Sequence, residues 1–377
     1  MLKRVCPLLC RANRSLSTHS GTAQQTESVV PRDALRSFVI RCMEKVGTKR
    51  DHASVLAELL VAADYRGHYS HGLNRLDMYV RDIESGMCVS DKEPQIAKET
   101  AATALVNGNN VLGPVVGRFC IDTAIQKAKT AGIGWVSANG SNHFGIAGWY
   151  AMRAMDQGLI GLAFTNTSPL MVPTRAKQAT LGTNPLSCAA AANNGDSFVL
   201  DMATTAVALG KLELNERKGL SIPLGWGCDS SGKTTTNPSE ATGLMPLGGT
   251  EECSGYKGYG LAMMVEVFCG ILAGADFGSN IRRWKTTDRV ANVGQCYIAI
   301  DPSAFAPGFS DRLTELNNTL RKLEPAEGET EILVPGDPEK KHMEKCDKLG
   351  GIPYHANQIK YANELASKLG IATLNTL

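Results

Sequence analysis

Two short segments carry side chains that could exchange a proton with a small acid. The first is Ser70-His71-Gly72, followed by Arg75. An imidazole in a glycine-flanked turn titrates near neutral pH and can give or accept a proton, and the neighbouring hydroxyl can orient it. The guanidinium of Arg75 offers a two-pronged donor for a carboxylate. A helix cap and a surface arginine are the alternative interpretations.

The second segment is Asn142-His143-Phe144-Gly145, which lies between an expected strand and an expected helix. A helix N-terminus preceded by glycine favours anions, so His143 could meet a substrate or a cofactor there. A surface loop with an incidental histidine is the alternative. Asp201 ends an apolar strand, where its carboxylate could orient an imidazole or cap the next turn.

Two other patterns carry less weight. His68 and His71 have metal-ligand spacing, but no third ligand lies nearby in the sequence, so no metal site is predicted. Residues 227–234 match the phosphate-binding pattern GxxxxGK[ST]. A working phosphate loop leaves a strand and opens a helix. Here a poor strand precedes it and Thr-Thr-Asn-Pro-Ser follows, so a Gly/Ser turn is predicted instead.

The elements that must position these residues alternate between helix and strand. Residue 51 is expected to be an N-cap, and the apolar helix 259–274 is expected to be buried. A hairpin is predicted from 186–192 and 197–201, and it requires antiparallel pairing. A helix is also expected after the polar segment 68–75, ending at about residue 86. The other expected helices are 32–46, 51–66, 121–131, 146–156, 259–274, 311–323 and 357–369, and the expected strands are 134–138, 159–165 and 296–300. No GxGxxG follows a strand, so a Rossmann fold is not expected.

Composition excludes several classes of protein. The chain has 377 residues, with 43% apolar and 20% charged residues and a net charge of +2. It shows neither the basic stripe of a nucleic-acid binder nor an apolar stretch long enough for a membrane span, so neither partner is expected. Eleven scattered cysteines without a CxxC pair favour free thiols in a reducing compartment.

The first 26 residues differ from the rest of the chain. They contain Lys3, Arg4, Arg11 and Arg14 and no acidic residue. On a helical projection the basic and apolar residues fall on opposite faces, which is typical of an organelle transit peptide. A mitochondrial matrix location is therefore expected, with the cytoplasm as the alternative.

Several motifs together resemble the type 2 malate/L-lactate dehydrogenase family, which includes ureidoglycolate and sulfolactate dehydrogenases and piperideine-2-carboxylate reductases. They follow the family's order from about residue 30 to 377. The turn after Trp226 departs from the family, with Thr234 and Asn237 replacing its usual Pro and Asp. The matching motifs are Asp64-Tyr-Arg-Gly-His-Tyr-Ser-His-Gly-Leu-Asn-Arg75, Asn142-His-Phe-Gly145, Leu181-Gly-Thr-Asn-Pro185, Leu200-Asp-Met-Ala-Thr204, Tyr256-Lys-Gly-Tyr-Gly-Leu261 and Pro335-Gly-Asp-Pro-Glu339.

The resemblance implies an α/β protein of the α+β type that is not a Rossmann fold and forms a homodimer. A mixed, largely antiparallel sheet domain would span 96–257. A helical domain drawn from both chain ends would span 27–95 and 258–377, with a strand near 294–301 joining the sheet. Residues 1–26 would be the transit segment.

The resemblance also implies roles for single residues. Ser70 and His71 match the family's relay and proton-transfer pair, Arg75 its substrate-carboxylate contact and Asp201 a supporting acid. His143 matches the proton acceptor of some members, so the choice between the two histidines stays open, with His71 preferred. The matching cofactor contacts are His143, Phe144, Gly145, Lys257, Pro335, Gly336, Asp337, Pro338 and Glu339.

The expected activity is transfer of a hydride between NAD or NADP and C2 of a small 2-hydroxy or 2-oxo acid, with malate as the leading candidate. Reduction of a cyclic 2-imino acid needs the same proton donor and carboxylate contact, and it is the first alternative. A nucleotide-hydrolysing module and an inactive binding protein are more distant alternatives. The sequence does not select between NAD and NADP.

Overall fold

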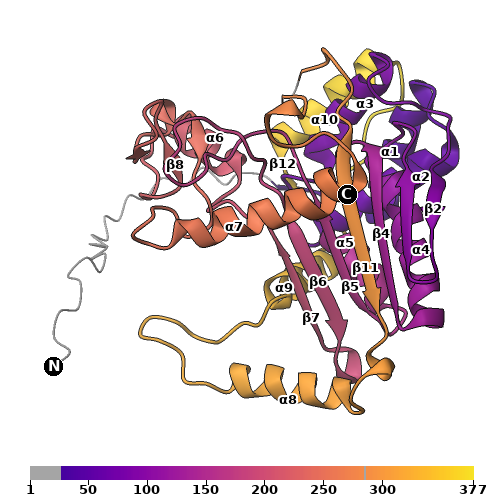
Figure 1. The fold of residues 1–377 in the computed structure, drawn as a ribbon. Coiled ribbons are helices and arrows are strands. Elements are labelled where there is room, and N and C mark those ends of the chain that lie inside the picture. Colours follow the sequence, from indigo (N-terminus) through magenta and orange to yellow (C-terminus); the bar gives the residue numbers. More distant parts are fainter. Residues whose placement is uncertain (1–26, 284–285) are drawn as a thin grey trace.

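A seven-stranded sheet forms the centre of the molecule (Figure 1). The computed structural model describes residues 27–283 and 286–377, so the predicted transit segment lies outside the described residues. All neighbouring strands are antiparallel except β3 and β4. The prediction of a mixed, largely antiparallel sheet is therefore confirmed. In spatial order the strands are β2 (Gln95–Glu99), β3 (Thr103–Asn107), β4 (Ile133–Ser141), β11 (Val293–Ile300), β5 (Ile160–Thr165), β6 (Leu186–Ala191) and β7 (Ser197–Met202).

The central strand β11 comes from late in the chain and inserts between β4 and β5, as expected for the strand near 294–301. Nearly all of its residues are buried, because helices cover both faces of the sheet there. On one face lie α4 (Gly113–Ala131) and α5 (Gly148–Met155). Helix α4 begins eight residues before its expected start, because Gly113 and Gly117 allow close packing rather than weakening the helix.

The two ends of the described chain meet in a layer of helices. Strand β1 (Glu27–Val30) pairs with β12 (Ile352–His355). The helices of this layer are α1 (Arg32–Lys45), α2 (Arg50–Tyr65), α3 (Leu76–Glu84), α9 (Asp337–Leu349) and α10 (Ala356–Leu369). Helix α2 starts at Arg50 with Lys49 as its N-cap, so the prediction that Asp51 caps it is wrong. Asp51 instead lies in the first turn, where its charge suits the helix dipole.

A small lobe projects from the sheet and contains a second, three-stranded sheet. It consists of α6 (Leu209–Arg217), β8 (Gly227–Cys228), β9 (Thr234–Thr235) and β10 (Gly243–Leu244). Between β8 and β9, the carboxylate of Asp229 accepts the backbone N–H groups of Ser231 and Lys233. These donors point at the chain's own carboxylate, and a strand follows them, which confirms the predicted turn.

The helix expected over 259–274 is only partly buried. Helix α7 (Gly255–Glu266) continues into a π-helical turn, Val267–Ile271. One side packs on β11, but the side chains of Met263, Val267 and Leu272 are about half exposed. The prediction of a buried helix was wrong because only one face of α7 meets the sheet. Helix α8 (Phe309–Arg321) lies apart from α7 (Figure 1). Among the described residues, no helix is long and apolar enough to cross a membrane.

Candidate active site

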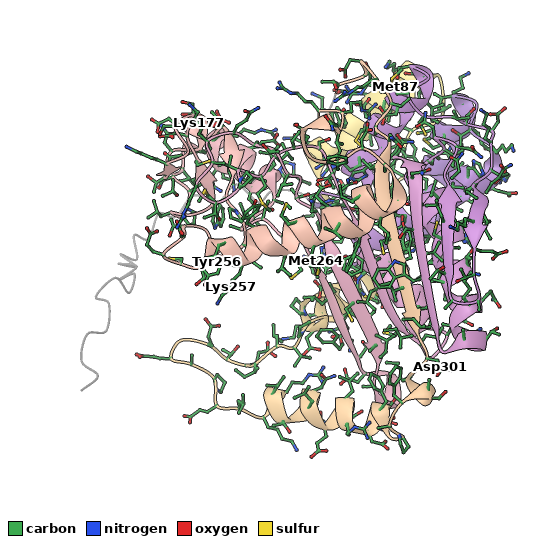
Figure 2. The ribbon with its side chains drawn as sticks, viewed as in Figure 1. Met87, Lys177, Tyr256, Lys257, Met264 and Asp301 are labelled. Carbon is green, nitrogen blue, oxygen red and sulfur yellow. The ribbon has the colours of Figure 1, made fainter. Side chains whose placement is uncertain are left out.

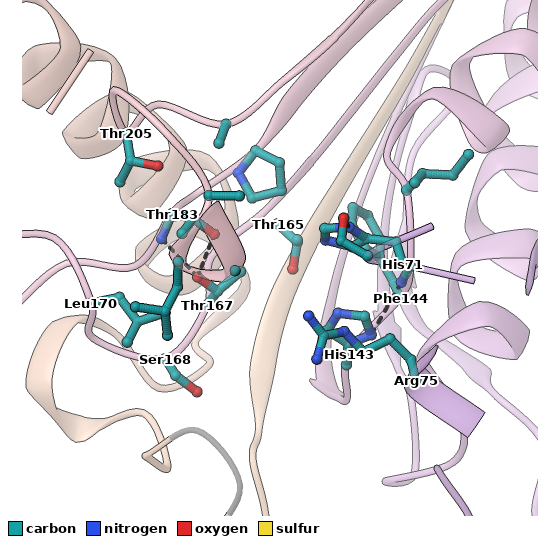
Figure 3. Close-up of a pocket in the computed structure, with 18 of the residues that line it drawn as sticks. His71, Arg75, His143, Phe144, Thr165, Thr167, Ser168, Leu170, Thr183 and Thr205 are labelled. Atoms are coloured by element: carbon teal, nitrogen blue, oxygen red, sulfur yellow. Dashed lines mark hydrogen bonds between the residues drawn. The ribbon is translucent and has the colours of Figure 1, made fainter. Parts of the chain in front are cut away.

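A cavity of about 670 Å³ opens between the helical layer, the sheet and the small lobe. We name two of its sides (Figure 3). The histidine wall consists of Ser70, His71, Arg75 and His143. The threonine wall consists of Thr167, Ser168, Leu170, Thr183 and Thr205. The pocket therefore has proton-exchanging and carboxylate-binding groups on one side, and mostly hydroxyl groups on the other.

The turn that carries Ser70 and His71 is fixed by a buried carboxylate. Asp64, near the end of α2, accepts the backbone N–H of Leu73 at 2.8 Å and the hydroxyl of Tyr354 at 2.6 Å. A Cβ atom at Gly72 would lie only 2.0 Å from this carboxylate, so glycine is required there. Burial raises the pKa of Asp64 to about 7, against the lowering effect of its two donors.

His71 is held by its neighbour in the sequence. Its Nδ1 lies 2.9 Å from Oγ of Ser70. Burial, together with the nearby charges of Arg75 and His68, lowers the pKa of His71 to about 4. The ring is therefore neutral at pH 7, which is the form that can accept a proton from a hydroxyl group.

His143 lies parallel to His71, with 5.9 Å between the ring centroids. Its Nδ1 accepts the N–H of Gly145 at 3.3 Å, and the hydroxyl of Tyr79 lies 2.7 Å from the same nitrogen. Because Nδ1 is an acceptor, the neutral ring carries its proton on Nε2. Burial lowers the pKa of His143 well below its usual range, and His71 and Arg75 reinforce the shift. His143 is therefore arranged as a neutral hydrogen-bond donor.

Asp201 lines the pocket near the start of α5. Its Oδ2 accepts the N–H of Gly148 at 2.7 Å. Burial raises the pKa of Asp201 to about 6, although Gly148 and Arg66 act in the opposite direction. The carboxyl group contacts the loop that follows His143 rather than an imidazole, so the structure places it as a support for that loop. Its predicted role as a supporting acid stays a prediction.

The structure brings together most of the residues predicted for the site. Ser70, His71, Arg75, His143, Phe144, Gly145 and Asp201 all line the cavity. Lys257 and residues 335–339 are not among the described residues that line the cavity. Lys257 lies near the far end of α7 (Figure 2). Its predicted cofactor contact stays a prediction.

The turn formed by Pro335, Gly336, Asp337, Pro338 and Glu339 opens helix α9 behind the pocket. The guanidinium of Arg321 donates hydrogen bonds to the carboxylates of both Asp337 and Asp196, so Asp337 forms an ion pair within the protein. Glu339 lies 3.6 Å from Nε2 of His68, which does line the cavity. The turn therefore contacts a residue of the cavity, His68, but does not line the cavity itself. Its predicted cofactor contacts stay predictions.

Sequence reasoning missed Tyr79 and the anchoring role of Asp64. Tyr79 follows Arg75 by four residues and thus lies on the same face of a helix, which is a signal that the sequence contained. The role of Asp64 depends on Tyr354, which is 290 residues away in the sequence. No local pattern could have revealed that contact.

The cavity also has features that suit a nicotinamide dinucleotide. Its volume falls within the range of small-molecule sites. The N-terminal turn of α6, with Gly210 and Lys211, lines it, and a helix N-terminus with a lysine favours phosphate groups. The residues present therefore fit such a cofactor. The described residues contain no cluster of three or more His, Cys, Asp or Glu side chains that could hold a metal ion.

Comparison with known proteins agrees with this site. Residues 30–362 match the family model described as malate/L-lactate dehydrogenase. The chain is 39% identical over 351 residues to malate dehydrogenase of Pyrococcus abyssi, covering 92% of this chain and 96% of that protein. It is 36% identical over 340 residues to L-sulfolactate dehydrogenase of Methanocaldococcus jannaschii, covering 89% and 96%.

The fold matches as well. The solved structure of malate dehydrogenase from Pyrococcus horikoshii OT3 superimposes with a TM-score of 0.86 at 35% identity, covering 94% of this chain and 99% of that one. The chain belongs to the malate/L-lactate dehydrogenase family, whose fold is not a Rossmann fold. It is an NAD(P)-dependent 2-hydroxyacid dehydrogenase. Relatives in the family are named for NAD(+) or for NADP(+).

Proposed function

We propose that the protein interconverts malate and oxaloacetate. The observation that carries this proposal is the grouping of Arg75, His71 and His143 on one wall of one pocket. A guanidinium binds a planar carboxylate through two parallel hydrogen bonds, and this would fix C2 beside the two imidazoles.

The proton would move through His71. In malate oxidation, neutral His71 accepts the proton of the C2 hydroxyl group while Ser70 holds the ring through Nδ1. His143 donates from Nε2 to the same oxygen, because Tyr79 and Gly145 hold its Nδ1 as an acceptor. A bound nicotinamide would supply the acceptor for the hydride that leaves C2. Reduction runs the same proton transfer in reverse.

A substrate panel tests this function. Oxaloacetate, pyruvate, 3-sulfopyruvate and a cyclic 2-imino acid would each be offered with NADH and with NADPH, while the absorbance of the reduced nicotinamide is followed. We expect oxaloacetate to give the highest kcat/KM. A higher value for the cyclic imino acid would replace this proposal with the reductase alternative. The same panel decides between NAD and NADP.

We also propose that the protein is a homodimer. Helix α7 and the π-turn that follows it expose Tyr256, Met263, Val267, Ile271 and Leu272. Figure 2 shows Tyr256, Lys257 and Met264 along α7. Exposed apolar side chains gathered on one element favour a protein interface. Sedimentation of the purified chain should give twice the monomer mass, and a monomer at micromolar concentration would contradict the proposal.

The acid-free segment 1–26 supports a mitochondrial location, which is a further proposal. A C-terminally tagged chain should be imported and shortened at a position before Glu27. A purely cytosolic signal with an intact N-terminus would contradict it.

A further inference from the structure

A buried ion pair in the pocket wall takes no part in the proton path. Nη2 of Arg282 lies 3.1 Å from Oδ2 of Asp82, and their side chains are only 11% and 8% exposed. Both residues line the cavity. An ion pair in such a place is expensive to bury, because both charged groups lose their hydration.

Helix α3 places this pair relative to the carboxylate-binding arginine. Arg75, Met78 and Asp82 all line the pocket and follow helical spacing along one face. Asp82 lies seven residues after Arg75, which is two helical turns or about 10 Å along the axis. Arg75 and the guanidinium held by Asp82 thus lie at opposite ends of one stretch of pocket wall.

The position of Arg282 is fixed by three contacts. Besides the contact with Asp82, Nη1 donates to the carbonyl of Arg289 at 3.4 Å. The backbone carbonyl of Arg282 accepts the hydroxyl of Ser168, on the threonine wall, at 2.7 Å. Within the described part of the chain, these guanidinium contacts engage two of the five N–H groups of the fork. The others remain for a ligand.

Charge around the cavity favours an anionic ligand. More cationic than carboxylic side chains line it, and burial raises the pKa of Asp201, one of the carboxyl groups. The cationic residues are Arg75, Arg81, Lys211, Arg282 and Arg283, and the acidic ones are Asp82, Asp201 and Glu213. A substrate with one carboxylate would use Arg75 alone and leave Arg282 facing the cavity.

We infer that Arg282, held by Asp82, binds a second anionic group of the substrate and makes the enzyme selective for 2-hydroxy acids that carry an anion on C3. Malate carries a carboxylate there and 3-sulfolactate a sulfonate, whereas lactate has only hydrogen. This inference rests on the proposed function. It adds the residue that separates two-anion substrates from lactate.

The test compares kcat/KM for malate, 3-sulfolactate and lactate. Removing Arg282 alone would leave Asp82 buried without a partner and could destabilise the fold. The main variant is therefore the double variant Arg282→Met with Asp82→Asn, which removes both charges. Asn matches Asp in size, and Met replaces the apolar stem of Arg without the guanidinium. We expect kcat/KM for malate and for 3-sulfolactate to fall about 10- to 100-fold, and the value for lactate to change less than about 3-fold.

Two control variants isolate the guanidinium. Arg289→Met removes the same charge from an exposed side chain in the same segment and leaves the carbonyl that Arg282 contacts. Arg289→Met should therefore retain the wild-type preference for malate over lactate. Asp82→Asn alone keeps Arg282 but removes the carboxylate that holds it, so the preference should fall less than in the double variant. Loss of that preference in Arg289→Met would overturn the inference, because a general charge effect would then explain the result.

Other outcomes overturn the inference without touching the proposed function. Equal losses for malate and lactate in the double variant would show that Arg282 only supports the fold. A rise confined to the KM of the nicotinamide cofactor would assign Arg282 to the cofactor instead. The proposed function fails separately, if the wild-type enzyme does not turn over malate. The wild-type ratio between malate and 3-sulfolactate shows which second anion is preferred.

Discussion

The two walls of the pocket are supported by different hydrophobic clusters. Behind the histidine wall lies the main hydrophobic core, in which Leu73, Leu76, Tyr79 and Phe144 are buried. Behind part of the threonine wall lies a separate small cluster around Val207, Leu212, Ile222 and Leu244, which Leu170 also contacts. Catalytic imidazoles need positions fixed within fractions of an ångström, and a large close-packed core supplies this. The threonine wall instead supplies hydroxyl groups and the small lobe supplies the N-terminal turn of α6, and the contacts of these groups tolerate more variation.

The largest expected effect comes from the histidine wall. If His71 carries the proton, His71→Ala lowers turnover roughly 10²- to 10⁴-fold, because the hydroxyl proton has no acceptor. Cofactor affinity, measured by fluorescence titration of the reduced nicotinamide, should stay near wild type. Near-normal turnover would instead assign the proton to His143.

Arg75→Lys should have the next largest effect. It keeps the charge but loses the two parallel hydrogen bonds to the carboxylate. The transition state for malate should therefore be destabilised by about 2–4 kcal/mol, which lowers kcat/KM on the order of 30- to 1000-fold. Substrate amides without a carboxylate should be poor with the wild type and lose far less from the substitution. Equal losses for acid and amide would mean that Arg75 supports the structure only.

The anchor of the catalytic turn makes stability depend on pH. The pKa of Asp64 is raised from 3.8 to about 7 in the folded protein, so the folded state binds the extra proton between these values. The stability that this provides is complete below about pH 4 and is lost as the pH rises through 7. The free energy of unfolding should therefore decrease by on the order of 4 kcal/mol from this group between about pH 4 and pH 7. Urea denaturation at several pH values should show the decrease, and Asp64→Asn should flatten it.

Two substitutions, one in each hydrophobic cluster, test this difference between the walls directly. Leu212→Ala, in the small cluster, should lower the free energy of unfolding by about 2 kcal/mol, because its partly exposed neighbours can close around the cavity. Leu60→Ala, in the main core, should cost about 4 kcal/mol. We expect Leu212→Ala to raise the cofactor KM with little change in turnover. A larger loss of turnover in Leu212→Ala than in Leu60→Ala would mean that the small lobe fixes the catalytic groups.

Prediction from the sequence succeeded where a residue pattern reports directly on local structure. The hairpin over 186–201 followed from two strand-like runs separated by a glycine-containing turn, and it is present as β6 and β7. Helix α9 was missed because its sequence is highly charged and, of its side chains, only Cys346 is buried, so it has no apolar stripe. Strand β2 was missed because all five of its residues are exposed.

The sequence by itself determined which residue types are available for chemistry. It placed Ser70, His71 and Arg75 in one turn and His143 in a loop before a helix, because turns and helix starts depend on neighbouring residues. Only the tertiary structure decided the chemical state of those groups. The neutral imidazoles and the protonatable Asp64 follow from burial, which no local pattern encodes. The pairing of Asp82 with Arg282 joins residues 200 positions apart, and only the packing of the folded chain brings them together.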